Sequence, residues 1–166
     1  MRSWDDYKET IKSSEDLFTQ ARSGELTKTQ EYMLSHPGVD INQKNHKGYS
    51  PLMLSVYHGH FEVSELLLNH GADPDSADLS GNTILMGAAF KGDEEIIKLL
   101  IRHGARKDLI NNNGMTASEW ASAFGRQNAL AILQPEAKNS LLQTAINFTK
   151  ILRGMTKSHN GKEAAA

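Results

Sequence analysis

A run of ten residues, NHKGYSPLML at positions 45–54, is followed 33 positions later by a similar run, DLSGNTILMG at positions 78–87. Glycines keep the same step along the chain, in the series Gly48, Gly81 and Gly114, then Gly59, Gly92 and Gly125, and then Gly71 and Gly104. A fixed period of about 33 residues is typical of a solenoid whose unit is a turn followed by two short helices. The repeated stretch therefore predicts an all-α stack of helix pairs.

The period divides the chain into four predicted repeats. Two regular repeats span 44–77 and 78–110, and two degenerate repeats span 14–43 and 111–134. The end repeats depart from the pattern of the middle ones, as is expected of units that face water on one side.

Three further segments are predicted outside the repeats. Residues 1–13 have apolar side chains at helical spacing and indicate an N-terminal capping helix. Residues 135–153 form a second amphipathic pattern and predict a C-terminal helix, which either covers the open end of the fourth repeat or contacts a partner. Residues 154–166 are expected to be a polar tail.

Composition excludes several classes of function. The 166 residues carry a formal charge of −2, which argues against non-specific binding to nucleic acid or to an acidic membrane surface. No apolar run approaches the roughly 18 residues that suggest a membrane-spanning helix. The absence of cysteine excludes disulfides, thiolate catalysis and cysteine-based zinc sites. The first residues show no signal peptide, so the cytoplasm is the default expectation for localisation.

The repeated motifs resemble those of the ankyrin-repeat family. The resemblance rests on the 33-residue step, on the run from Gly48 to Leu54, and on the His-Gly-Ala sequences that begin at His70 and His103. It implies an all-α ankyrin-repeat solenoid of about four helix–turn–helix repeats, with β-turn or hairpin fingers and capping helices at both ends. Met53 and Met86 stand where the family usually has a histidine, and we expect both to replace its hydrogen bonds with apolar core packing.

No catalytic constellation is found in the sequence. It lacks a glycine-rich phosphate loop, a His-Glu-x-x-His motif and a Gly-x-Ser-x-Gly motif. The seven histidines are dispersed, whereas a metal site needs several converging ligands. We therefore expect no enzyme activity, no cofactor and no metal, and the two remaining classes are a protein-binding module and a structural scaffold.

The resemblance also implies a binding surface. In ankyrin repeats the finger tips and the outward side of each first helix form one concave face. Four large aromatic residues fall there, at positions that the core does not require, and aromatic side chains often supply much of the energy of an interface. The alternative for Phe90 or Phe124 is packing against a neighbouring repeat. The predicted partner-binding residues are His46, Lys47, Tyr49, Tyr57, His58, Leu79, Asn82, Phe90, Lys91, Asn112, Met115 and Phe124.

The runs at 48–54 and 81–92 further resemble small stand-alone bacterial ankyrin proteins that bind and regulate a partner enzyme. One such group assists catalases, and another blocks peptidoglycan endopeptidases and so protects the producing cell. The resemblance thus implies a non-catalytic inhibitor or self-protection protein, monomeric on its own, with a catalase accessory protein or a general scaffold as alternatives. The compartment would follow the partner: the periplasm for a cell-wall enzyme, if a leader has been removed, and the cytoplasm for catalase.

Overall fold

The computed structural model describes residues 16–135, and within them the chain forms helices and no strand. The predictions for residues 1–13, for the helix at 135–153 beyond its first residue, and for the tail at 154–166 lie outside the described residues. Four helix pairs follow one another along the chain: α2 (Leu17–Ser23) with α3 (Leu26–Ser35), α4 (Pro51–His58) with α5 (Phe61–Asn69), α6 (Ile84–Lys91) with α7 (Glu94–Arg102), and α8 (Ala117–Ala123) with α9 (Gln127–Leu133). The predicted all-α stack is confirmed.

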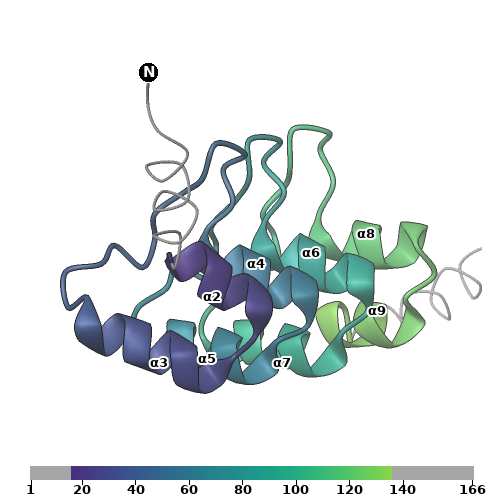
Figure 1. Ribbon diagram of the computed structural model, residues 1–166. Coiled ribbons are helices and arrows are strands. Elements are labelled where there is room, and N and C mark those ends of the chain that lie inside the picture. The colour runs from purple at the N-terminus through teal and green to yellow at the C-terminus, as the bar shows by residue number, and fades with distance from the viewer. Residues whose placement is uncertain (1–15, 136–166) are drawn as a thin grey trace, which may run out of the picture. The chain divides into compact units, whose positions relative to one another are not determined.

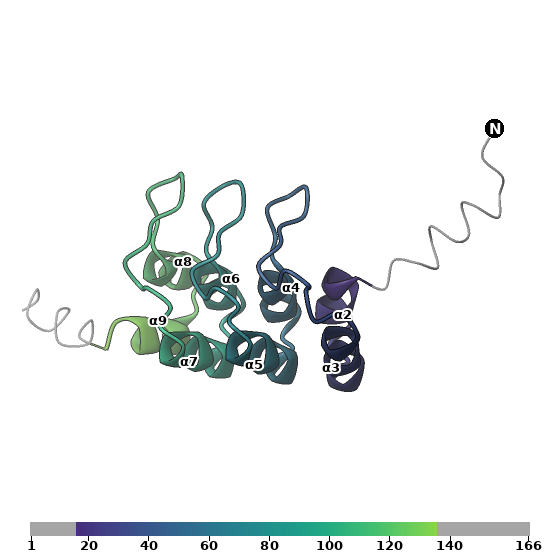
Figure 2. The ribbon, with the colours of Figure 1, turned by 90° about the vertical axis from the view of Figure 1, so that its left-hand side faces the viewer.

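The helix pairs stack into two layers (Figure 1). The first helices α2, α4, α6 and α8 pack side by side in one layer, and the second helices α3, α5, α7 and α9 pack in the other. The loops that precede α4, α6 and α8 project as fingers, all to the same side of the array (Figure 2). We call the exposed surface of the first-helix layer, together with these fingers, the first-helix face.

The core lies between the two layers. The second helices contribute fully buried residues such as Val63, Leu67 and Leu100, and the first helices contribute residues such as Leu52 and Ile84. No helix in the described part of the chain is both long enough and apolar enough to span a bilayer.

Each first helix in the three fingered repeats begins with a hydroxyl cap. The side chains of Ser50 and Thr83 accept hydrogen bonds from backbone N–H groups three residues ahead, at 3.2 and 3.3 Å. Met86 is fully buried, as expected, and its sulfur accepts a weak hydrogen bond from the Thr83 N–H at 3.4 Å. The methionine therefore packs in the core and also closes the first turn. Met53 differs, because it is only partly buried and faces a pocket.

The fingers are hairpin-like loops, each organised by one side chain that recurs every 33 residues. The Oδ1 atoms of Asn45, Asp78 and Asn111 each accept two backbone N–H groups, from the residues two and four positions ahead, at 2.8–3.0 Å. The backbone N–H of the same residue donates to the carbonyl four positions ahead. The fingers are the β-turn or hairpin loops that were expected, and in the described loops their β-bridging is limited to an isolated pair between Ala77 and Thr83.

Neighbouring fingers also bond to each other. The Asn112 N–H donates to the Ser80 carbonyl at 3.0 Å, and the Asn111 amide donates to the Asn82 side chain at 2.8 Å. Gly81 lies at this contact with a left-handed φ of 75°, and a Cβ atom there would approach Asn112 Oδ1 to 2.9 Å. Gly114 has almost the same φ, 74°, but a Cβ atom there would meet nothing within 4 Å.

These two glycines separate backbone strain from finger packing. We expect Gly114→Ala to lower the free energy of unfolding by about 1–2 kcal/mol, the usual cost of a left-handed residue with a side chain. Gly81→Ala should cost clearly more, because its methyl group also pushes the next finger away. Urea unfolding followed by circular dichroism measures both values, and equal losses would contradict the close contact between fingers.

Candidate functional site

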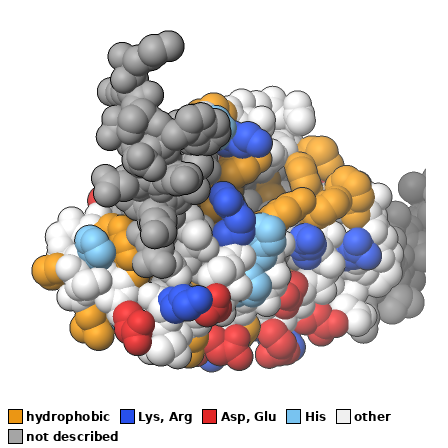
Figure 3. All heavy atoms as spheres, viewed as in Figure 1, with side chains coloured by type: hydrophobic (Ala, Val, Ile, Leu, Met, Phe, Trp, Pro, Cys, Tyr) orange, Lys and Arg blue, Asp and Glu red, His pale blue; other side chains and the backbone are white. Residues whose placement is uncertain are grey.

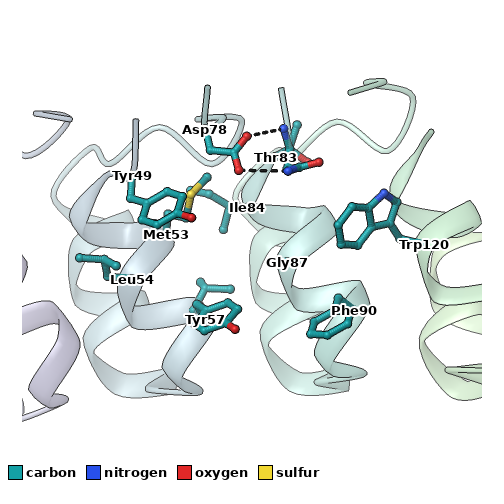
Figure 4. Close-up of a pocket in the computed structure, with 12 residues that line it drawn as sticks. Tyr49, Met53, Leu54, Tyr57, Asp78, Thr83, Ile84, Gly87, Phe90 and Trp120 are labelled. Atoms are coloured by element: carbon teal, nitrogen blue, oxygen red, sulfur yellow. Dashed lines mark hydrogen bonds between the residues drawn. The ribbon is translucent and has the colours of Figure 1, made fainter. Parts of the chain in front are cut away.

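A pocket of about 330 Å³ opens on the first-helix face, beneath the second finger (Figure 4). Tyr49, Met53 and Tyr57 line one side of it, and Phe90 and Trp120 line the other. The pocket therefore draws side chains from three successive repeats, which the stacking of α4, α6 and α8 brings together.

The pocket is open because of Gly87. The 33-residue register makes Gly87 equivalent to Leu54 in the preceding repeat and to Trp120 in the following one. A Cβ atom at Gly87 would meet nothing within 4 Å, so the missing side chain leaves free space between these neighbours. A small residue at this one position thus turns a continuous surface into a pocket.

An aromatic cluster forms one wall of the pocket. Phe90 meets Phe124 edge-to-face with 4.7 Å between ring centroids and meets Trp120 at 6.1 Å. Phe90 is partly buried by these contacts, whereas Phe124 is 49% exposed. Phe90 therefore shows the packing against a neighbouring repeat that was expected as the alternative to partner binding. Phe124 packs against Phe90 and also stays exposed, so its binding of a partner remains a prediction.

Tyr57 connects the pocket to a row of basic side chains. Its ring lines the pocket and is 48% exposed, and Lys91 Nζ lies 4.6 Å from the ring centroid. The His58 ring meets Tyr57 edge-on at 5.7 Å, and His60 stacks against His58 at 6.0 Å. Apolar and basic groups are therefore adjacent on this face.

We call this row, which consists of Arg22, His58, His60, Lys91 and Arg126, the cation row. Figure 3 shows basic and histidine side chains bordering the apolar patch, with acidic side chains gathered over the second helices. Two members of the row join neighbouring repeats, since His60 Nε2 lies 2.9 Å from the Arg22 carbonyl and Arg126 Nε donates to the Phe90 carbonyl at 2.9 Å. None of the five forms a salt bridge with a carboxylate of the described residues.

The surroundings of His58 lower its pKa. Partial burial, and then the charges of His60, Arg22 and Lys91, lower the pKa of His58 below its ordinary value of 6.5. A nearby anion would raise its pKa again.

The predicted finger residues have two kinds of surroundings. His46, Lys47, Leu79 and Asn112 are exposed, with Leu79 at 74%, whereas Tyr49, Asn82 and Met115 are partly buried. The side chains of Asn82 and Asn112 also bond to neighbouring finger groups, so they brace the fold as well as facing solvent.

The Asp78 carboxylate at the edge of the pocket is committed to structure, whereas the buried Nε1 of Trp120, which also lines the pocket, has no hydrogen-bond partner among the described residues. Both carboxylate oxygens of Asp78 accept hydrogen bonds from Asn82, at 2.9 and 3.0 Å (Figure 4). No three His, Asp or Glu side chains of the described residues converge as metal ligands would. What the arrangement offers chemically is an apolar pocket with a basic border, which is suited to binding.

Three residues that shape the pocket were not among the predicted site residues: Met53, Gly87 and Trp120. Met53 was assigned to the core, and the other two were not assigned to the site. One signal was present, since aligning the repeats at the 33-residue step places a glycine between a leucine and a tryptophan.

The open space at Gly87 gives a stability prediction. Gly87→Ala should raise the free energy of unfolding by about 0.5–1 kcal/mol, because alanine favours a helix interior and its methyl group meets no atom. Gly92→Ala is the control, since Gly92 ends the same helix with a φ of 77° and should lose stability. Thermal unfolding of both variants measures the difference, and a loss for Gly87→Ala would contradict the open space.

The titration of His58 gives a second prediction. In the folded protein its imidazole should titrate below 6.5, and Lys91→Gln should move its pKa upward by removing one repelling charge. The unfolded chain binds a proton at His58 at a higher pH than the folded protein does. The free energy of unfolding should therefore decrease as the pH falls from the pKa of the unfolded state to that of the folded state. NMR titration of the ring signals measures the pKa. Lys98→Gln on α7 is the control and should leave it unchanged.

Comparisons with known proteins agree with the repeat architecture. A family model described as ankyrin repeats in three copies matches residues 71–144, and a model of a single ankyrin repeat matches residues 47–79. Among curated proteins, the ankyrin repeat-containing protein ITN1 of Arabidopsis thaliana is 38% identical over 56 residues, which is 34% of this chain. The chain covers only 10% of the length of that plant protein.

The two family matches together extend over more than half of the chain. Repeats of this kind are typically non-catalytic modules for binding other proteins. With its helix pairs, its fingers and these matches, the chain belongs to the ankyrin-repeat family.

Proposed function

We propose that this protein captures one partner protein on its first-helix face and thereby regulates that partner. The observation that carries the proposal is the open pocket flanked by exposed aromatic side chains, with Tyr57 and Phe124 about half exposed. Soluble proteins rarely leave such apolar surface uncovered around a pocket unless it binds something. Rigid aromatic residues beside a pocket are the usual anchors of an interface.

The rigidity of the array supports the same proposal. The aromatic residues stand on short helices that are fixed by their neighbours, and the fingers are bonded to one another. A face that is already ordered loses little conformational entropy when it binds, so more of the contact energy appears as affinity.

The partner we propose is an enzyme whose active site is covered by this face. The support is the resemblance of the runs at 48–54 and 81–92 to stand-alone bacterial ankyrin proteins that regulate enzymes. A peptidoglycan endopeptidase is the first partner to test, with self-protection as the biological role. A catalase that gains activity in the same assay would instead indicate the accessory role.

A photo-crosslinking experiment tests the capture. With a benzophenone amino acid at position 57, on the first-helix face, we expect crosslinks to one dominant protein in native cells. The same amino acid at position 98, on the exposed side of α7, should give no such product. Crosslinks from position 98 but not from position 57 would contradict the proposed face.

The captured enzyme then tests regulation. We expect the activity of the enzyme to fall when the purified protein is added in equimolar amount. Tyr57→Ala should reduce the binding free energy by about 2 kcal/mol, as the loss of an aromatic anchor does, and should therefore weaken the inhibition. Phe90→Ala is a poorer test, because Phe90 also packs against the fourth repeat. Unchanged inhibition by Tyr57→Ala, with unchanged thermal unfolding, would contradict the proposed function.

A further inference from the structure

We propose that the segment bound on this face is acidic, with one large apolar side chain in the Gly87 pocket and a carboxylate against His58 and Lys91. This inference rests on the proposed function and names the chemistry of its partner. Two features of the face, one apolar and one electrostatic, carry it independently.

The apolar feature is the space left by Gly87. The equivalent positions of the neighbouring repeats hold Leu54 and Trp120, so the backbone at this position accommodates a large side chain. The walls of the pocket are the rings of Tyr57, Phe90 and Trp120 and the flexible side chain of Met53 (Figure 4). A leucine or aromatic side chain from a partner would replace the side chain that this repeat lacks.

The electrostatic feature is the cation row. The titratable or charged groups around His58 are Arg22 from α2, His60 from the start of α5, Lys91 from α6, and Asp93, whose carboxylate lies next to Gly59 at the start of α7. His60, Arg22 and Lys91 are basic, and they disfavour a further proton on the imidazole. A carboxylate placed here would meet several positive groups, and a basic segment would be repelled.

Helix stability alone offers another explanation for these cations. Arg22, His58 and Lys91 each lie in the last turn of a first helix, where positive charge favours the helix dipole. That role would affect stability but would not select the charge of a bound peptide. Peptide binding therefore separates the two explanations.

Tyr57 belongs to both features, so the apolar side chain and the carboxylate of the bound segment must lie close together. Tyr57 lines the pocket, and Lys91 Nζ lies 4.6 Å from the centroid of its ring. A single short segment can therefore fill the pocket and reach the cation row. The acidic residues over the second helices disfavour placement of its carboxylate on that side.

The first experiment selects ligands without assuming a partner. A phage-displayed library of random twelve-residue peptides is panned against the full chain. The selected peptides are expected to combine one Leu, Phe or Trp with neighbouring Asp or Glu residues. Enrichment of basic peptides, or of peptides without an apolar anchor, would overturn the inference.

The second experiment measures the best selected peptide, labelled with fluorescein, by anisotropy against variants. Gly87→Leu should weaken binding at least tenfold, and Lys91→Gln should weaken it about threefold to tenfold and reduce its salt dependence. Lys107→Gln is the matched control, an exposed cation in the loop after α7, and should leave the affinity unchanged. Equal affinity for the wild type and Gly87→Leu would overturn the pocket assignment.

The pH dependence of peptide affinity is a third measurement. If the cation row had only a structural role, this dependence would not be expected. A bound carboxylate raises the pKa of His58, so binding takes up a proton, and affinity should be higher at pH 6 than at pH 8. His58→Gln should flatten this dependence. If the affinity of His58→Gln keeps the same pH dependence, another group causes it. That result would overturn the placement of the segment's carboxylate against His58.

The outcomes also separate this inference from the proposed function. Suppose that position 57 captures an enzyme and that Gly87→Leu and Lys91→Gln bind this enzyme as well as the wild type does. This result would overturn the inference and leave the proposed function standing. Absence of capture from position 57 would contradict the proposed function itself. Thermal unfolding of every variant shows that a loss of binding is not a loss of fold.

Discussion

The helices of the described repeats are too short to be stable by themselves. They contain seven to ten residues, whereas isolated helices below roughly 12–15 residues are marginal in water. Each pair is therefore stabilised by the apolar residues that it buries against the next pair, such as Val63 and Leu100. This dependence requires every repeat to keep the same register, and the register in turn places equivalent positions side by side on the first-helix face.

The register has a second support in the fingers. Asn45, Asp78 and Asn111 each hold their own loop with the same pair of backbone hydrogen bonds, and bonds such as that from Asn111 to Asn82 join one loop to the next. Because Asp78 and Asn82 are used in this way, they border the pocket as structural groups. The fingers thereby fix the upper edge of the site while the helices fix its floor. The pocket therefore exists because the repeats keep one register while position 87 holds a glycine in place of a large side chain.

The candidate site was predicted in part. Tyr57 and Lys91 were expected on one face, and the structure places the Lys91 ammonium over the Tyr57 ring. Phe90 was expected either to bind a partner or to pack against a neighbouring repeat, and its ring lies against Phe124 and Trp120 of the next repeat. Trp120 was overlooked because its repeat departs from the common pattern. Its ring lies against Phe90 of the preceding repeat, a contact between repeats that no inspection of one repeat reveals.

The sequence by itself determined the period, the all-α class, the order of the helices and the residues that begin and end them. These features depend on local interactions, such as the cap at Thr83 and the left-handed glycine at Gly92, so they can be read along the chain. Only the tertiary structure decided that Gly87 leaves a pocket and that five basic side chains form one row without a salt bridge to a carboxylate of the described residues. These features depend on side chains from different repeats meeting in space, and their distances are set by how the helix pairs stack.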